Sequence, residues 1–167
     1  MSQQGELVDA MVQTGKPVVV VLSNGRPLAV PDVAARVPAI LEVWYAGQEG
    51  GTAVGEVLFG DVNPGGKLPV TFPRHTGQIP VYYNRRPTSF RNHLDLTREP
   101  LWAFGHGLSY TTFSLTNLKV ESPTIGPAEL SLINRQMQRI VEPGRFDVMV
   151  GTSSTTLTTA TLDVVER

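Results

Sequence analysis

The sequence predicts an α/β fold: a partial parallel-sheet α/β sandwich, followed by a small, incomplete antiparallel β-sandwich. Val18–Leu22 and Ala39–Tyr45 are apolar runs of strand length, and a short helical segment follows each of them. Strand, helix, strand, helix in that order implies parallel strands joined by right-handed crossovers. After Phe113 the pattern changes to short alternating strands separated by turn residues, which predicts the antiparallel part.

The first element is predicted to be a helix over Glu6–Thr14, because its apolar residues recur at helical spacing and Gly15 with Pro17 ends it. Val18–Leu22 is continuously apolar and β-branched, which is typical of a strand covered on both faces. Ser23–Gly25 is predicted to be a turn. Asp32–Arg36 is expected to form a helix of at most two turns.

The most informative stretch begins with the predicted strand Ala39–Tyr45. The glycine pair Gly50-Gly51 then opens a predicted helix, Thr52–Phe59, and a Pro/Gly-rich turn leads to a second short strand before Pro73. Glycines between a strand end and a helix start allow close backbone approach to a ligand. In an α/β sheet that edge is where ligands bind. The helix is expected to bury Val54, Val57 and Leu58.

The chain is predicted to divide at about Thr112. Residues 1–112 would hold the α/β part, including a long irregular connection over 73–107, and residues 113–167 the β part. Three strands are expected in the second part: Phe113–Val120, Phe146–Val150 and Thr158–Val165. So few strands cannot close a seven-stranded sandwich.

The composition excludes several functions. The net charge is −1, with no basic block, so nucleic acid is not an expected partner. The absence of cysteine excludes disulfides, thiolate metal sites and a cysteine nucleophile. No apolar run approaches the roughly 20 residues that cross a membrane, and no signal peptide is recognised, which leaves the compartment open.

Two candidate ligand sites fail on spacing. The stretch Gly60–Lys67 invites comparison with a phosphate-binding loop, but that motif requires glycine where Asp61 stands and a helix after the lysine. A structural turn is favoured. The histidines lack metal-ligand spacing, so neither a cofactor nor a metal is expected; they are His75, His93 and His106.

Carboxylates near loop edges offer a third candidate, since glycoside hydrolysis needs two carboxyl groups roughly 5–10 Å apart. These are Glu42, Glu49, Asp61 and Asp95. Glu49 lies at the ligand edge of the sheet, yet a carboxylate there can also cap the following helix through its free N–H groups. Capping or structural pairing is favoured over sugar contact. Tyr82–Arg86 places aromatics beside cations, for which packing is favoured over sugar stacking.

Six stretches occur in the order of a known family: Gly15–Pro27, Trp44–Gly51, Val57–Pro64, Gly66–Pro73, Gln78–Asn84 and Phe104–Phe113. Together they resemble glycoside hydrolase family 3, in particular bacterial β-glucosidases of the three-domain type. The resemblance covers nearly the whole chain.

The resemblance implies a retaining exo-glycosidase of β-glucosides, with β-xylosides as a further substrate. The family places a catalytic barrel first, an α/β sandwich second and a fibronectin-III-like domain third. This chain resembles the latter part of the second domain and pieces of the third. Glu142–Gly151 resembles the last strands of that third domain, and its central strands would be missing between Glu121 and Leu132.

The family's nucleophile is an aspartate on the barrel. Its acid/base is a glutamate on a loop of the second domain, upstream of the segment that resembles Gly15–Leu22, and this chain is expected to begin too late to include it. No catalytic residue can therefore be assigned within this chain. Residues expected to face the sugar cleft or the barrel are Arg26, Trp44, Tyr45, Gln48, Glu49 and the loop 82–95.

Three hypotheses follow. The chain is a piece of a β-glucosidase that is inactive alone and joins a barrel-bearing chain or itself to act on a β-glucoside or oligosaccharide. Alternatively, it is a non-catalytic module that binds carbohydrate or protein. A weaker third hypothesis is autonomous catalysis by Glu49 and a local carboxylate. Self-association is expected, because an incomplete sandwich leaves apolar surface and strand edges open.

Overall fold

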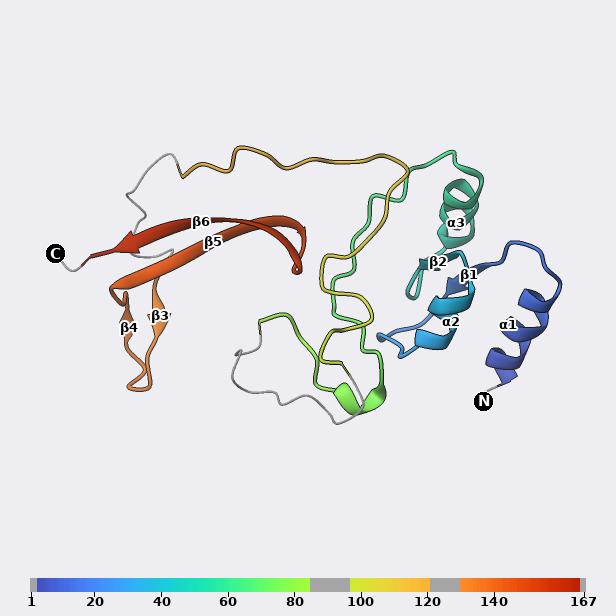
Figure 1. The fold of residues 1–167 in the computed structure, drawn as a ribbon, viewed down its shortest axis with the longest axis horizontal. Helices are drawn as coiled ribbons and strands as arrows, with labels where there is room; N and C mark the ends of the chain where they lie inside the picture. The colour runs from blue at the N-terminus through green and yellow to red at the C-terminus, as the bar shows by residue number, and fades with distance from the viewer. Residues whose placement is uncertain (1–2, 85–96, 121–129, 166–167) are drawn as a thin grey trace. The chain divides into compact units, whose positions relative to one another are not determined.

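The computed structural model describes residues 3–84, 97–120 and 130–165. The chain divides into two compact units, Met1–Thr112 and Phe113–Arg167. Figure 1 shows short helices and a small sheet in the first unit and a long curved hairpin in the second. The predicted α/β class is confirmed, with a parallel pair of strands in the first unit and antiparallel pairs in the second.

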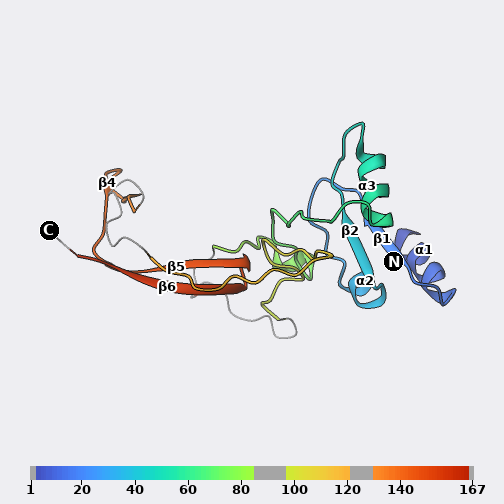
Figure 2. The ribbon, with the colours of Figure 1, turned by 90° about the horizontal axis from the view of Figure 1, so that it is seen from above.

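The sheet of the first unit is formed by β1 (Val19–Leu22) and β2 (Ala39–Glu42). The strands pair in parallel, with Val19 beside Ala39 and Leu22 beside Glu42. Figure 2 shows them side by side, with α2 (Pro31–Arg36) in the connection between them. Because the pairing is parallel and in register, the carboxyl ends of both strands meet at one edge of the sheet.

Two further helices belong to this unit, α1 (Gln3–Gln13) and α3 (Gly50–Phe59). Asp9 of α1 forms an ion pair with Arg36 of α2. Gly60 ends α3 in a left-handed conformation with φ of 86°, and its N–H donates to Val57 O at 3.2 Å. Glycine adopts this conformation without steric cost, so the Gly60 segment is a helix stop, as the sequence predicts.

Two burial predictions are wrong. Val19 is 49% exposed and Val21 is 40% exposed, so β1 is not covered on both faces. Leu58 of α3 is 43% exposed, and Val54 and Val57 are half-buried. The apolar pattern predicted layers on both sides of the sheet, but the described sheet has two strands and leaves one face of β1 open.

The best-buried part of the first unit lies in two irregular segments. Figure 1 shows the green segment after α3 running beside the yellow segment that follows residue 96. Leu68 N donates to His106 O and Gly105 N donates to Leu68 O, both at 2.8 Å, and Phe72 bridges Trp102 in antiparallel fashion. Phe72 is fully buried. The expected short strand before Pro73 is thus reduced to a single bridge.

The long connection begins with a 3₁₀ turn, η1 (Thr76–Gln78). Gln78 anchors it: its side-chain oxygen accepts from Arg74 N at 2.6 Å, and its amide nitrogen donates to Thr97 O at 2.9 Å. Residues 85–96 of this connection lie outside the described residues, and with them Asp95, His93, Arg85 and Arg86.

The second unit contains two antiparallel hairpins. A short one pairs β3 (Leu132–Ile133) with β4 (Arg139–Ile140), and a long one pairs β5 (Gly144–Ser153) with β6 (Thr156–Val164). The long hairpin confirms both predicted C-terminal strands, each longer than expected. Phe146 lies opposite Leu162, which is 7% exposed, and Arg145 lies opposite Asp163 on the other face.

The predicted strand Phe113–Val120 is not formed. Its alternating pattern suggested a strand, but Asn117 has φ of 59°, in the left-handed region that interrupts extended backbone. Ser114, Leu115, Thr116 and Leu118 instead line a pocket with Val150 and Thr158 of the hairpin. Residues 121–129, where missing strands were expected, lie outside the described residues.

No helix within the described ranges is long and apolar enough to cross a membrane.

Candidate functional site

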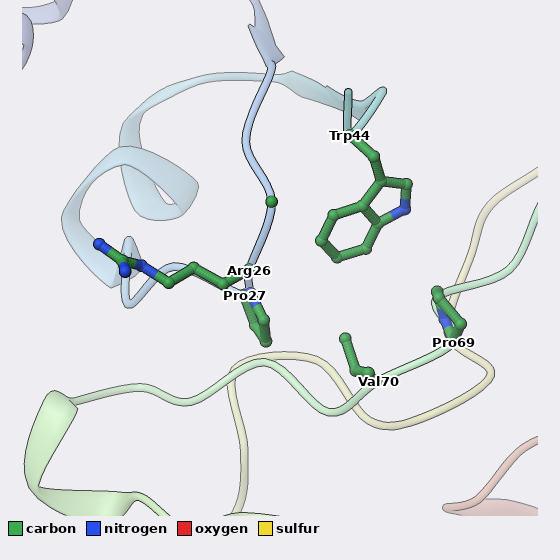
Figure 3. Close-up of a pocket in the computed structure, with 6 residues that line it drawn as sticks. Arg26, Pro27, Trp44, Pro69 and Val70 are labelled. Carbon is green, nitrogen blue, oxygen red and sulfur yellow. The ribbon is translucent and has the colours of Figure 1, made fainter. Parts of the chain in front are cut away.

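A shallow pocket of about 250 Å³ opens where the two parallel strands of the first unit end. Its walls come from the segments that follow β1, β2 and α3, and they are almost wholly apolar (Figure 3). The lining residues are Gly25, Arg26, Pro27, Trp44, Pro69 and Val70. Ligands of open α/β sheets bind outside the carboxyl ends of the strands, so this pocket is the candidate site.

The turn after β1 is held by its side chains. Ser23 Oγ donates to Trp44 O at 3.0 Å, and Asn24 Nδ2 donates to Glu42 Oε2 at 3.1 Å. Arg26 N donates back to Asn24 Oδ1 at 3.3 Å. A Cβ at Gly25 would lie 2.6 Å from Cε2 of Tyr45, so glycine lets the tyrosine ring lie against the backbone of this turn.

Trp44 is the most constrained residue of the pocket. Its φ is 52°, a conformation that is uncommon for a large side chain. The residue is held there from both sides, because its N–H donates to Glu42 Oε1 at 3.0 Å while its carbonyl accepts from Ser23. Backbone strain of this kind persists where surrounding contacts over-determine it, and it clusters at binding sites. Because Trp44 also lines the pocket, it is the first residue of the candidate site to test.

An aromatic row lies behind the pocket. The ring centroids of Trp44 and Phe72 are 5.9 Å apart, and those of Phe72 and Trp102 are 5.4 Å apart with edge-on geometry. His106 stacks on Trp102, and its pKa is lowered by burial first and by the Lys67 ammonium second. Lys67 Nζ itself donates to Gly107 O. The row joins the pocket to the best-buried part of the unit.

The five residues expected to face a sugar or barrel are only partly brought together. Trp44 and Arg26 line the pocket, but the Arg26 guanidinium points away from the space around Trp44, Pro27 and Val70 (Figure 3). Tyr45 is 79% exposed and lies against the turn after β1. Gln48 and Glu49 are exposed and do not line the pocket. What these residues face in a complex stays a prediction.

The two glutamates have different roles. Glu49 occupies the N-cap position of α3, but its side chain makes no capping bond to the backbone. Of the two structural roles predicted for it, capping through free N–H groups is therefore wrong, whereas it does pair with a side chain, accepting a long hydrogen bond from Thr52 Oγ1 at 3.4 Å. Glu42 is the structural carboxylate, since its two oxygens bind Asn24 and Trp44 N.

The described histidines have structural partners. His75 Nδ1 accepts from Gly77 N at 3.0 Å and caps η1, and His106 stacks on Trp102. Among the described residues, no group of three or more potential metal ligands lies together. Tyr83 stacks on Phe104 with ring centroids 4.6 Å apart, although it remains 60% exposed.

Sequence reasoning missed the far wall of the pocket, Pro69 and Val70, which it assigned to a short strand. It also missed the anchor Asn63, whose Oδ1 accepts from Tyr110 N at 2.8 Å and Ser109 Oγ at 2.9 Å. The signal was faint: Asn63 precedes Pro64 and resembles an ordinary turn residue. The Asn24-Gly25 dipeptide was correctly taken as a turn.

Comparison with known families assigns the fold. The glycosyl hydrolase family 3 C-terminal domain matches residues 1–110. The chain belongs to that family. The match spans the two parallel strands, α3 and the segments that build the pocket, so the resemblance predicted from the motifs is confirmed.

Curated relatives of this glycosyl hydrolase family 3 chain are much longer. It is 48% identical over 133 residues to a periplasmic β-glucosidase of Salmonella typhimurium, covering 73% of this chain and 17% of that protein. It is 36% identical over 217 residues to a β-xylosidase of Formosa agariphila, covering 90% of this chain and 30% of that protein. An alignment longer than the 167 residues of this chain means that the xylosidase holds internal residues that this chain lacks.

Solved structures agree with this assignment. A β-glucosidase from Erythrobacter marinus matches with a TM-score of 0.92 and 31% identity, over 99% of this chain and 30% of that one. The β-glucosidase from Listeria innocua in complex with glucose matches with a TM-score of 0.83 and 28% identity, over 95% of this chain and 32% of that one. The chain thus spans about a third of the solved chains it matches.

Proposed function

We propose that this chain is the C-terminal scaffold of a family 3 β-glucosidase or β-xylosidase and does not hydrolyse sugars alone. The two curated relatives described above act, by their names, on β-glucosides and β-xylosides. The resemblance places the nucleophile on a barrel and the acid/base upstream of Gly15. In this reading the catalytic carboxylates come from a barrel-bearing chain. The second unit of this chain is then a shortened fibronectin-III-like domain.

The observation that carries the proposal is the use of Glu42. Retaining glycosidases need two carboxyl groups about 5–5.5 Å apart, one acting as nucleophile and one as acid/base. Glu42 is the carboxylate nearest the pocket in sequence, and both of its oxygens hold the backbone and Asn24. Glu49 is exposed and does not line the pocket. These roles support a scaffold rather than a hydrolytic pair.

The test measures turnover of chromogenic β-glucoside and β-xyloside by the purified chain. We expect none alone, and activity when the chain is mixed with the barrel-bearing part of the Salmonella β-glucosidase. Turnover by the chain alone that is lost in Glu49→Gln and retained in Glu56→Gln would instead establish autonomous catalysis. Glu56 is a matched control because it is an exposed glutamate on α3, within two turns of Glu49.

A second candidate function, a non-catalytic carbohydrate-binding module, is favoured by Trp44, whose indole lines an apolar pocket and whose backbone is held at a positive φ. Aromatic faces stack on the apolar faces of sugar rings. Tryptophan fluorescence titrated with glucose, xylose and cellobiose tests it. Saturable quenching that is lost in Trp44→Phe but kept in Trp102→Phe would support this function, and a flat titration would exclude it.

A further inference from the structure

We propose that the outer edge of β6 is a self-association surface, on which β6 of a second copy of this chain adds antiparallel. The inference concerns the second unit and does not depend on the proposed function. It rests on the composition of this strand, on its one-sided pairing and on the register in which two copies can meet.

The first observation is an unusually uncharged run. From Thr152 to Leu162 the chain has no charged residue, no proline and no glycine. Threonine and leucine dominate it, and β-branched residues favour strands. A segment of high β-propensity and low charge, without proline, pairs readily with a copy of itself when it lies on a sheet edge.

The second observation is that β6 is such an edge. Among the described residues, the sheet of the long hairpin has two strands, so β6 pairs with β5 on one side (Figure 1). Thr156, Thr158, Thr159 and Thr161 are all exposed. Natural proteins protect sheet edges with charges, proline or bulges. The central part of β6 has no charge or proline, and the register shift of the hairpin lies at its first residues.

The third observation distinguishes β6 from β5. The opposite edge of the hairpin carries Arg145 and Asp147, which lie on the polar face of the sheet. In β6 the single charge is Asp163, next to the end of the strand, where it pairs with Arg145 at 3.1 Å. Charged residues therefore protect the β5 edge of the hairpin, whereas the β6 edge lacks this protection.

Two copies of β6 can pair antiparallel in a register that suits the side chains of both. A two-fold axis perpendicular to the sheet keeps each side chain on its own face. With the axis at Ala160, Thr159 lies opposite Thr161 of the second copy and Thr158 lies opposite its Leu162. Threonine pairs of this kind stabilise adjacent strands, and Asp163 does not meet its own copy. The apolar face that carries Leu162 continues across the pair, so the occupant that fits is a second copy.

The experiment measures the mass of the full-length chain by light scattering over a range of concentrations. We expect the wild type to pass from monomer to dimer, and Thr159→Lys to weaken association by at least about tenfold, because lysine blunts a strand edge. The matched control is Met149→Lys. Met149 lies directly opposite Thr159 on the same face but on β5, and it is 57% exposed.

Each outcome decides the proposal. Association lost in Thr159→Lys and kept in Met149→Lys supports the β6 edge. Loss of association in Met149→Lys alone would assign the surface to β5, and loss in both variants would assign it to the face of the sheet. A wild type that stays monomeric would show that no such surface exists. Each of these three results overturns the proposal. Hydrogen exchange adds a readout without mutation, since β6 amides should gain protection as concentration rises. Far-UV circular dichroism confirms that each variant keeps its hairpin.

Discussion

Among the described residues, the buried side chains of the first unit lie in irregular segments, whereas the buried side chain of the second unit, Leu162, lies in a strand. Val37, Thr71, Phe72 and Ala103 are buried, and none of them belongs to a named helix or strand. Leu162, by contrast, belongs to β6. The two units therefore depend on different interactions.

The first unit relies on side chains that bind backbone far away in sequence. Asn63 binds Tyr110 N, Gln78 binds Thr97 O and Ser23 binds Trp44 O. The second unit relies on a backbone ladder that runs from Gly144 opposite Val164 to Ser153 opposite Thr156. A backbone ladder tolerates side-chain changes, whereas a loop held by side chains does not. Single substitutions should thus affect the first unit more strongly.

The largest expected effect is that of Phe72→Ala. The ring is fully buried and contacts both Trp44 and Trp102, so its removal leaves a cavity in the aromatic row. We expect the free energy of unfolding of the first unit to fall by about 3–5 kcal/mol. Urea titration followed by tryptophan fluorescence reports on this unit, because both tryptophans belong to it.

The control for this prediction is Phe59→Ala, in the same unit. Phe59 is 88% exposed, so its removal should change stability by less than about 0.5 kcal/mol. Equal destabilisation by the two variants would show that the first unit is not organised around Phe72.

Leu162→Ala tests the second unit. The side chain is 7% exposed and lies opposite Phe146, so its truncation should cost about 2–4 kcal/mol. Far-UV circular dichroism should show the hairpin melting earlier while tryptophan fluorescence stays unchanged. Leu157→Ala, on the same strand but 42% exposed, is the matched control. A simultaneous shift of the fluorescence transition would show that the two units unfold together.

Glu42→Ala should have a smaller effect, about 1–3 kcal/mol, since it removes one acceptor each from Asn24 and Trp44 N. The expected signature is local: faster hydrogen exchange at the Trp44 amide and a change in tryptophan emission. Glu56→Ala removes an exposed carboxylate and should leave both unchanged. If the Trp44 amide keeps its protection from hydrogen exchange in Glu42→Ala, the left-handed conformation of Trp44 is held by Ser23 or by the contacts of its ring instead.

The smallest effect is a pH dependence of the first unit. Burial and Lys67 lower the folded-state pKa of His106 below the ordinary value of about 6.5. Below that pH the unfolded chain binds the proton more readily, so stability is full above about pH 6.5 and falls as the pH drops through the folded pKa. Unfolding followed by tryptophan fluorescence at pH 7.5 and pH 5.5 measures this dependence. The loss of stability between the two pH values should be smaller in His106→Gln and unchanged in His75→Gln. An unchanged loss in His106→Gln would assign it to other groups.

Local sequence signals predicted the elements well. The helices over residues 3–13 and 50–59, the two parallel strands and the C-terminal hairpin are set by periodicity, β-branching and glycine stops, which act over a few residues. The family could be identified for the same reason, because its motifs are contiguous. The strand expected at Phe113–Val120 failed because alternation does not reveal a left-handed Asn117.

Burial and the candidate site depended on contacts between distant residues. The apolar runs of β1 and α3 indicated buried surfaces, but how much of each is covered depends on what packs against it, which periodicity does not encode. Pro69 and Val70 join the pocket because their segment pairs with residues 101–106, a pairing without any sequence signal. Glu42 became a support of Asn24 rather than a candidate catalyst because the parallel register brings the two strand ends together.

The order of helices and strands, the turn at Asn24-Gly25 and the family were therefore determined by the sequence alone, since each depends on neighbours along the chain. The tertiary structure decided which aromatic ring is buried, which carboxylate is occupied and which residues surround the pocket. Those outcomes require residues 18 to 47 positions apart to meet, and such contacts depend on chain topology rather than on local preference.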